Sequence, residues 1–392
     1  MFEHKKRVMY MIGTLGHGRG GHFYSLRTTA EALNGTIKPF VVNIGKNNSP
    51  VIDSAEVPKE TVLFNGWNII KTIRSLVKLV KEEKIDIIHT FDTRVAWFGR
   101  FLSVYYKIPI IHTVCGGPNP VEFSSHIKYC ILYSQENLDY VQNIEKFKDV
   151  QLYLIPNRVG ISKIDVERIN LIKKSIKLEG KTFLRIARFD SAYKKSMVEA
   201  IDLIQYLNQK NLKTQLILIG AIENSVVYEE ILAYIRDNFI ENIYVLTDDI
   251  FTINASELIE VADFIIGTGR GLMEAASQNK IILTPVKDSE FPILVNKDNF
   301  MSFFSTNFSP RNAMGNNLKN ENIEHIVDVL KNINSFKKAK RNSEFFFKEY
   351  FYIDSKKNEY EKIYKNLEYQ GDSLFNFEEI KSFLRTIKRY IR

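Results

Sequence analysis

Short apolar runs alternate with longer amphipathic ones along most of this chain, in two successive blocks. In the first block the runs with the length of strands are residues 7–13, 39–44, 85–90, 108–114, 129–133 and 152–155. Helical patterns lie between them, and residues 68–84 place Ile69, Ile73, Leu76 and Val80 on one face. Strands that are apolar on both faces and alternate with helices indicate a parallel sheet covered by helices on both sides.

The second block has the same plan without repeating the sequence. Its strand-like runs are residues 183–187, 215–219, 243–246, 263–266 and 281–284. The fold class is therefore predicted to be α/β, with two Rossmann-like, doubly wound domains that face each other across a cleft, followed by C-terminal helices. We expect an N-terminal domain over 1–160, a linker over 161–180, a second domain over 181–345 and a helical segment over 346–392.

Composition excludes several other classes of protein. The 392 residues are 45% hydrophobic and 26% charged, which is typical of globular chains. Two cysteines, Cys115 and Cys130, are too few for a disulfide framework or a four-thiolate zinc site, and they favour a cytoplasmic location. No stretch reaches the ~18 uncharged apolar residues that suggest a transmembrane helix. The net charge of +8 fits an anionic substrate or membrane, and without a recognition motif we expect no nucleic-acid partner.

The first loop with unusual residues follows the first predicted strand. Gly16, Gly18 and Gly21 match the pattern G-x-G-x-x-G between a strand and a helix, where backbone amides can approach a phosphate. A dinucleotide-binding domain would also need an acidic residue at the end of the second strand, and residues 41–45 contain none. We therefore expect phosphate approach by this loop, or a simple tight turn, rather than a dehydrogenase.

Two further loops lie in the second block. Arg188, Lys194 and Lys195 follow its first strand, where they would either neutralise a diphosphate or form a solvated basic loop. Residues 267–271 contain three glycines and lead into a helix predicted over 272–278, whose first turn carries Glu274. That carboxylate either complements the helix dipole or accepts two hydroxyls of a ribose, and the sequence leaves both interpretations open. No stretch has the spacing of a metal site, so no metal or other cofactor is expected.

Taken in order, these segments resemble glycosyltransferase family 4, the group 1 transferases with the GT-B fold, over roughly residues 7–345. The matching segments are the paired glycines Gly20 and Gly21, residues 85–89, residues 155–159, Arg188 with Lys194 or Lys195, and residues 262–275. The resemblance implies that Arg188, Lys194 or Lys195, and Glu274 act on the donor. It also implies that the backbone at Gly20, Gly21, Gly269, Arg270, Gly271 and Leu272 binds it.

The sequence departs from the family pattern at three places. The family usually has a second glutamate eight residues before the position of Glu274, and here that position is Ile266. Cys115 occupies the position where many members have a histidine, and His112 lies within the preceding strand. The spacing from arginine to lysine is one residue longer than usual, so the sequence does not separate Lys194 from Lys195.

The resemblance implies a metal-independent, retaining transfer of a sugar from a nucleoside diphosphate sugar, UDP-linked, to a hydroxyl of a glycan or lipid-linked acceptor. The expected setting is bacterial surface polysaccharide synthesis, such as capsule or lipopolysaccharide, in the cytoplasm or at the inner face of the membrane. Two alternatives remain: a nucleotide-sugar epimerase of the same architecture, and a non-catalytic nucleotide-sugar-binding partner of another transferase, which the missing glutamate motivates.

The C-terminal residues 375–392 form an amphipathic helical pattern. Its apolar positions are Phe377, Ile380, Phe383, Leu384, Ile387 and Ile391, and its basic ones are Lys381, Arg385, Lys388, Arg389 and Arg392. Such a helix either lies on an anionic membrane or docks on the body of the protein with its basic face in water.

Overall fold

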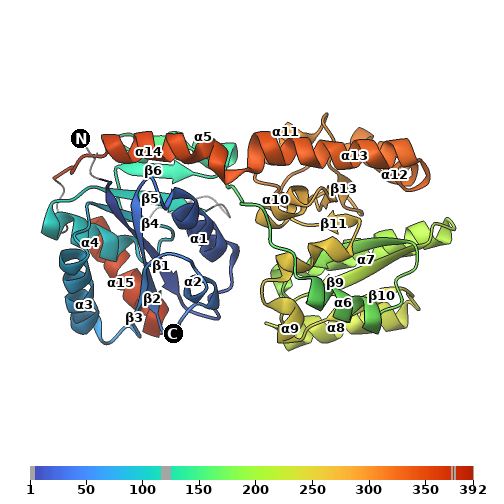
Figure 1. Ribbon diagram of the computed structural model, residues 1–392, viewed down its shortest axis with the longest axis horizontal. Coiled ribbons are helices and arrows are strands. Elements are labelled where there is room, and N and C mark those ends of the chain that lie inside the picture. Colours follow the sequence, from blue (N-terminus) through green and yellow to red (C-terminus); the bar gives the residue numbers. More distant parts are fainter. Residues whose placement is uncertain (1–4, 116–124, 372–373, 375–376, 392) are drawn as a thin grey trace. The chain divides into compact units, whose positions relative to one another are not determined.

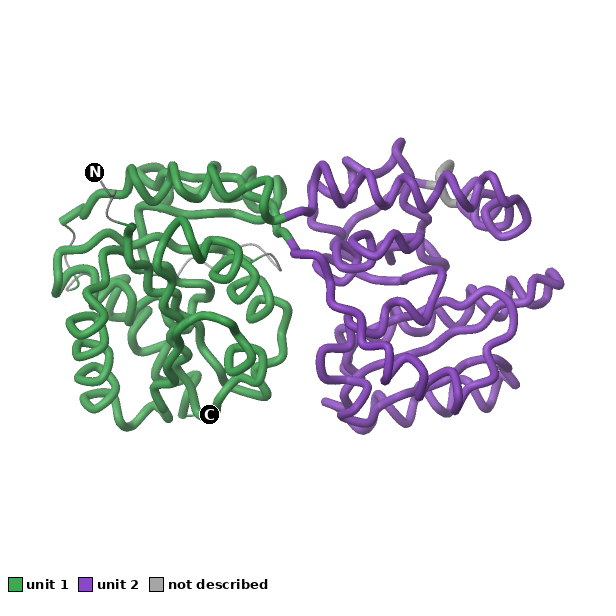
Figure 2. The backbone as a smooth tube through the Cα atoms, viewed as in Figure 1, with its two compact units in different colours: residues 1–158, 353–392 green, residues 159–352 purple. Residues whose placement is uncertain are grey.

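The computed structural model describes residues 5–115, 125–371, 374 and 377–391. The chain forms two compact units, one made of residues 1–158 and 353–392 and the other of residues 159–352 (Figure 2). Each contains a parallel or mostly parallel sheet with helices packed on it (Figure 1). The predicted α/β class with two Rossmann-like domains is confirmed.

The sheet of unit 1 has seven strands in the order β3-β2-β1-β4-β5-β6-β7, and every neighbouring pair is parallel. The strands are β1 (Arg7–Thr14), β2 (Lys38–Gly45), β3 (Lys59–Leu63), β4 (Ile87–Thr90), β5 (Ile110–Val114), β6 (Tyr129–Leu132) and β7 (Gln151–Leu154). The two central strands β1 and β4 are almost wholly buried because helices cover both faces of the sheet.

The helices of unit 1 make two layers. One core joins the sheet to α1 (Gly21–Leu33), α2 (Pro50–Asp53) and α14 (Lys357–Asn366). The other joins it to α3 (Ile69–Glu82), α4 (Ala96–Tyr106) and the end of α15 (Phe377–Ile391). The short helix α5 (Gln135–Gln142) packs beside β6 and β7. Residues 375, 376 and 392 of the predicted C-terminal helix lie outside the described residues.

Unit 2 has a six-stranded sheet in the order β10-β9-β8-β11-β12-β13, parallel except for the last pair. Its strands are β8 (Lys181–Ile186), β9 (Thr214–Ile219), β10 (Ile243–Leu246), β11 (Phe264–Ile266), β12 (Ile281–Thr284) and β13 (Ile293–Leu294). Its helices are α6 (Val166–Ser175), α7 (Ser191–Gln209), α8 (Ser225–Asp237), α9 (Asp249–Thr252), α10 (Arg270–Ser277), α11 (Phe300–Ser305), α12 (Asn316–Lys331) and α13 (Ile333–Phe346).

The chain passes between the units twice, after Arg158 and before Ile353. The two passages are joined by a hydrogen bond from the Val159 amide to the Phe351 carbonyl, at 2.8 Å. Helix α6 occupies part of the stretch predicted as a linker, and its residues Ile169 and Ile172 are buried in the core of unit 2. The C-terminal helices α14 and α15 belong to unit 1, on which they pack, so the second half of the chain contributes to both units.

Among the described residues, no helix combines the length and the apolar character that crossing a membrane requires.

Candidate functional site

The loops singled out in the second block meet at one edge of the unit 2 sheet. Strands β8 and β11 are parallel neighbours, and Arg185 of β8 pairs with Ile266 of β11 in register. Their carboxyl ends therefore lie together, with residues 187–190 following one strand and residues 267–269 following the other. The sheet reverses its direction of growth between these two strands, and open α/β sheets bind ligands outside such a switch point.

Arg188 lies in the loop after β8 and forms an ion pair that the sequence pattern did not predict. Its Nη1 donates to Oε1 and Oε2 of Glu223, at 3.0 and 2.9 Å, and the arginine side chain is 45% exposed. Its guanidinium also lies 5.5 Å from the ring centroid of Tyr193. A diphosphate would therefore have to compete with the Glu223 carboxylate for this guanidinium. Glu223 comes after the carboxyl end of β9. Since residues of a site in such a sheet follow strand ends, its sequence position is the signal that could have identified it as a candidate.

The two lysines of this segment point to different sides of β8. Lys194 forms an ion pair with Glu230 of α8, with 2.8 Å between Nζ and Oε2. Lys195 donates to the backbone carbonyl of Lys287, which follows β12, at 2.8 Å. Because β9 with its following helix α8 and β12 lie on opposite sides of β8 in the sheet, Lys195 is the lysine on the side of the glycine-rich loop. The structure thus separates two residues that the sequence left equivalent.

A group of buried charges lies behind Lys195. Arg185 is 3% exposed and donates from Nη2 to Ser196 Oγ at 2.9 Å. Glu199 is 5% exposed, and its Oε1 lies 3.3 Å from Lys195 Nζ. Burial raises the pKa of Glu199 to about 7, although the Lys195 charge opposes that shift. Burial also lowers the pKa of the Arg185 guanidinium to about 10. Lys195 is therefore held by a carboxyl group that changes protonation near neutral pH.

The glycine-rich loop after β11 ends at the N-terminus of α10. Gly269 caps the helix with φ +49° and ψ −126°, a backbone conformation that residues with a Cβ rarely adopt. No side chain caps this end of α10. The amides of Gly271 and Leu272 donate to the loop carbonyls of Thr268 and Gly269, each at 3.2 Å, while the Leu272 side chain is fully buried. Two of the four predicted binding amides are thus engaged in the turn itself.

Glu274 lies further into α10 than the sequence pattern indicated. The helix begins at Arg270, so Glu274 is its fifth residue, and the expectation that it lies in the first turn is wrong. Its Oε1 accepts a hydrogen bond from Arg270 Nε at 2.8 Å, and the two side chains are only 13% and 12% exposed. Since charge–dipole effects fade beyond the first turn, a role as a simple dipole partner is disfavoured. The pairing instead orients the carboxylate.

In unit 1 the loop after β1 leads into α1 at the corresponding switch point, between β1 and β4. Gly20 caps α1 without any side-chain hydrogen bond, and Gly21 is the first helical residue. A Cβ added to Gly21 would meet no atom within 4 Å, so the backbone there is open to approach. Gly18 requires the absence of a side chain for a different reason. Its φ is +64°, and a Cβ there would lie 2.7 Å from Ser49 Cβ. Gly20 and Gly21 fit the N-terminus of a helix that binds a phosphate, whereas Gly18 forms the turn before it.

His89, from the matching segment 85–89, and His112, from a departure from the family pattern, are buried in the unit 1 sheet, and Cys115, from the same departure, is partly buried beside it. His89 is fully buried, with its Nδ1 2.8 Å from Tyr364 Oη and its Nε2 2.6 Å from Thr113 Oγ1, and burial lowers its pKa well below the usual value. Burial likewise lowers the pKa of His112 to about 4. The Cys115 thiol donates to the Phe91 carbonyl at 3.2 Å, and burial raises its pKa. All three groups are therefore uncharged at neutral pH.

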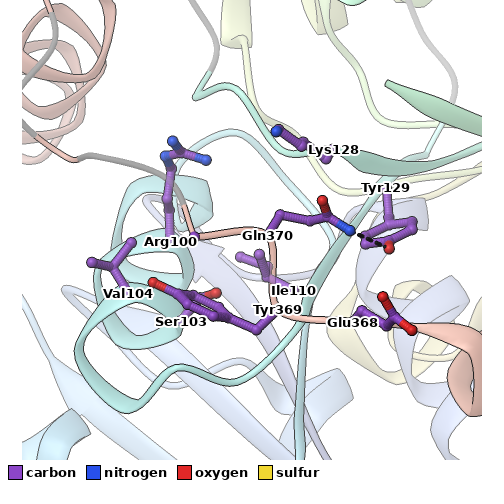
Figure 3. A pocket seen from close by; sticks show the side chains of 10 residues that line it. Arg100, Ser103, Val104, Ile110, Lys128, Tyr129, Glu368, Tyr369 and Gln370 are labelled. Atoms are coloured by element: carbon purple, nitrogen blue, oxygen red, sulfur yellow. Dashed lines mark hydrogen bonds between the residues drawn. The ribbon is translucent and has the colours of Figure 1, made fainter. Parts of the chain in front are cut away.

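A pocket of unit 1 lies at the opposite edge of the sheet, beside the amino ends of β5 and β6 (Figure 3). Within it Gln370 Nε2 donates to Tyr129 Oη at 2.6 Å. The residues that line it are Arg100, Ser103, Val104, Ile110, Lys128, Tyr129, Glu368, Tyr369, Gln370 and Gly371. Because the loops described above follow the carboxyl ends of the strands, this pocket is not part of the candidate site.

Solved structures that match this chain over almost its whole length define the class of fold as GT-B. A glycosyltransferase from Rickettsia africae ESF-5 is 14% identical with a TM-score of 0.67, and the match covers 93% of this chain and 98% of that one. Alr3699/HepE of Anabaena, in complex with UDP and glucose, is 14% identical with a TM-score of 0.66, covering 92% and 100%. A putative UDP-N-acetylglucosamine 2-epimerase from Listeria monocytogenes is 14% identical with a TM-score of 0.56, covering 94% and 99%.

The sequence by itself matches no model of a protein family and no curated protein. The predicted GT-B fold is confirmed by the structural matches. At 14% identity the likeness establishes the fold, which transferases and an epimerase share, and the reaction has to be argued from the site.

Proposed function

We propose that this chain is a glycosyltransferase that moves a sugar from a nucleoside diphosphate sugar to a hydroxyl group. The observation that carries the proposal is that Arg188 and Lys195 follow β8 while the N-terminus of α10 follows β11, its parallel neighbour at the switch point of the sheet. Cationic side chains at the carboxyl ends of these strands, with a helix N-terminus that no side chain caps, suit a diphosphate. The GT-B neighbour that holds UDP and glucose supports UDP as the nucleotide.

In the proposed reaction the bond between sugar C1 and the phosphate oxygen breaks, and the acceptor oxygen forms a bond to C1. The acceptor proton leaves to solvent, and the diphosphate departs with its bonding electron pair. Arg188 and Lys195 would stabilise the negative charge that grows on that diphosphate, so the transfer would need no metal ion. Glu274, oriented by Arg270, would accept hydrogen bonds from the ribose hydroxyls and position the donor.

The finer features are proposed on the resemblance to glycosyltransferase family 4. They are retention of the anomeric configuration and an acceptor that is a glycan or a lipid-linked glycan bound by unit 1. They also include a role in surface polysaccharide synthesis, such as capsule or lipopolysaccharide, at the cytoplasmic face of the membrane. Gly20 and Gly21 would let the amides at the start of α1 approach the donor phosphates.

Calorimetric titration with UDP in EDTA tests the donor site. Arg188→Ala and Lys195→Met should each weaken binding about 30-fold or more, because a charged contact to a phosphate contributes about 2–4 kcal/mol. Lys194→Met is the matched control, since its ion pair with Glu230 points toward α8 and is half exposed. Equal losses for the two lysine variants would remove the assignment of Lys195 to the site.

An epimerase is the second candidate, because one GT-B neighbour is described as a putative UDP-N-acetylglucosamine 2-epimerase. NMR of UDP-sugars incubated without acceptor separates the two reactions. A transferase leaves the sugar configuration unchanged until an acceptor is added, whereas an epimerase converts the sugar alone. A chain that binds UDP-sugar and does neither, with any acceptor tried, would instead be a non-catalytic partner.

A further inference from the structure

Helix α15 packs on unit 1 through polar side chains and through the rings of Tyr390 and Phe383. The residues of α15 that are buried are Glu379, Ser382, Thr386 and Tyr390. Glu379 is fully buried, and its Oε1 lies 3.1 Å from Arg100 Nε, a side chain that is 4% exposed. The same Oε1 accepts a hydrogen bond from the His126 amide at 2.8 Å. An ion pair whose two side chains are both buried therefore fixes the beginning of the helix.

The other end of the helix is fixed at the carboxyl edge of the unit 1 sheet. The Tyr390 hydroxyl donates to the carbonyl of Ile44, near the end of β2, at 2.9 Å. Arg389 Nη1 donates to Thr93 Oγ1 in the segment after β4, at 3.0 Å. Helix α15 thus runs across unit 1 and ends at the edge where the loop carrying Gly20 and Gly21 also lies.

This docking partly buries Phe383 and Ile387 but leaves four other apolar side chains of α15 exposed. Phe377 is 68% exposed, Ile380 48%, Leu384 58% and Ile391 41%. Their spacing of three, four and seven residues places them in one stripe along the helix. An amphipathic helix that merely completes a protein core would turn this stripe inward. The stripe is therefore an apolar surface that the folded unit does not use.

The loop before α3 lies against the end of the stripe. Gly66 contacts the end of α15 so closely that a Cβ there would lie 2.6 Å from Ile391 Cγ1. The next residue, Trp67, is 77% exposed. An exposed tryptophan beside an apolar stripe is typical of surfaces that enter the interface between water and lipid headgroups.

Basic side chains border the stripe along the helix. Lys381, Arg385 and Lys388 come one, five and eight residues after Ile380, and Lys388 is exposed. Of the two acidic residues at this end of the helix, Glu379 is buried, and Glu378 lies 3.7 Å from Lys146 Nζ and 3.9 Å from Lys381 Nζ. An apolar stripe with a basic border matches the charge and polarity of an anionic bilayer surface.

We propose that α15 and Trp67 form a membrane-binding surface for anionic phospholipid, with the stripe inserted among the acyl chains and the basic border on the headgroups. The stripe comprises Phe377, Ile380, Leu384 and Ile391, and the basic border comprises Lys381, Arg385 and Lys388. The inference rests on the proposed function, in which a lipid-linked acceptor is bound by unit 1. Adsorption through α15 would hold the carboxyl edge of that unit close to the bilayer, within reach of such an acceptor.

Vesicle co-sedimentation of the full chain tests the surface. We expect binding to vesicles of phosphatidylcholine with about one-third phosphatidylglycerol and at least tenfold weaker binding to phosphatidylcholine alone. Leu384→Ser should weaken the partition coefficient about tenfold, because an exposed leucine gains that much on leaving water. Lys381→Gln/Lys388→Gln should weaken it about 30-fold, because each lysine contributes about fivefold near an anionic surface.

Matched controls come from unit 2. Phe239→Ser removes an aromatic ring that is 91% exposed, and Lys173→Gln/Lys174→Gln removes two exposed charges. Both should bind vesicles as the unaltered chain does. Equal losses in the control and α15 variants would overturn the proposal, as would equal binding to the two kinds of vesicle.

Two measurements separate this proposal from its rivals. If the unaltered chain is a dimer in solution and Leu384→Ser makes it a monomer, the stripe is an interface between copies and the membrane proposal fails. UDP titration of the same variants should give unchanged affinity. Loss of vesicle binding with intact UDP binding in the α15 variants supports the membrane surface, whereas a chain that binds vesicles without binding UDP would refute the donor site alone.

Discussion

Replacement of Glu379 by alanine tests how α15 is held. The carboxylate is fully buried, forms the ion pair with Arg100 and accepts the hydrogen bond from the His126 amide. Glu379→Ala leaves the buried guanidinium without this carboxylate. Removing one partner of a buried ion pair typically costs about 3–5 kcal/mol, because the remaining charge stays desolvated. We expect that cost to appear as easier opening of α15.

Native-state hydrogen exchange of residues 377–391 measures that opening directly. A cost of about 3–5 kcal/mol corresponds to a fall in amide protection of roughly two to four powers of ten. Glu378→Ala is the control on the neighbouring position. Glu378 is 39% exposed and lies 3.7 Å from Lys146, and an exposed pair of this kind contributes less than about 1 kcal/mol.

A double variant distinguishes a buried charge from a merely lost contact. Arg100→Leu/Glu379→Leu removes both charges, so it should recover most of the protection that Glu379→Ala loses. Protection in Glu379→Ala within about threefold of that in Glu378→Ala would refute the reasoning. A double variant no better protected than the single one would show that the desolvated guanidinium is not the cause.

Three further predictions concern the two units. Glu199 has a pKa of about 7 in the folded chain against an ordinary 4.5, so the free energy of unfolding should fall as pH rises between these values, by at most about 3 kcal/mol. Glu199→Gln should remove that slope in urea titrations at pH 5 and 8, and an unaltered slope would contradict it. Tyr364→Phe removes a buried hydroxyl that lies 2.8 Å from His89 Nδ1 and 2.9 Å from Tyr10 Oη. It should cost about 1–3 kcal/mol in thermal unfolding, and an unchanged melting temperature would count against that network. Gly21→Ala meets no atom within 4 Å, so it should leave stability unchanged or slightly raised while donor turnover falls at least tenfold; normal turnover would exclude Gly21 from the site.

Most strands and helices could be predicted because their patterns are local. The predicted runs 243–246 and 281–284 coincide with β10 and β12, which are apolar segments between polar turns. Strand β3 was missed because only one of its residues, Val62, is buried. Strand β13 was missed because it has two residues, too few for any periodicity.

The candidate site was predictable in part. The loops after β1, β8 and β11 follow apolar runs and contain glycine or basic residues, so their sequence positions already placed them at strand ends. The partners of the charges were not predictable. Glu223 lies 35 residues from Arg188 and reaches it only because β8 and β9 are neighbours in the sheet. The choice between Lys194 and Lys195 likewise depended on which strands flank β8.

The sequence by itself determined the class of this protein: its apolar periodicity specifies two parallel α/β sheets, and residues next to strand ends identify the loops that can bind a ligand. Only the tertiary structure decided which unit the C-terminal helices join and which face of α15 turns inward. The helical pattern alone favours burial of Phe377, Ile380 and Leu384. The folded unit instead provides a desolvated partner for Glu379. The contacts of Glu379 with Arg100 and with the His126 amide join residues that are far apart in the sequence, so the helical pattern alone could not indicate this orientation.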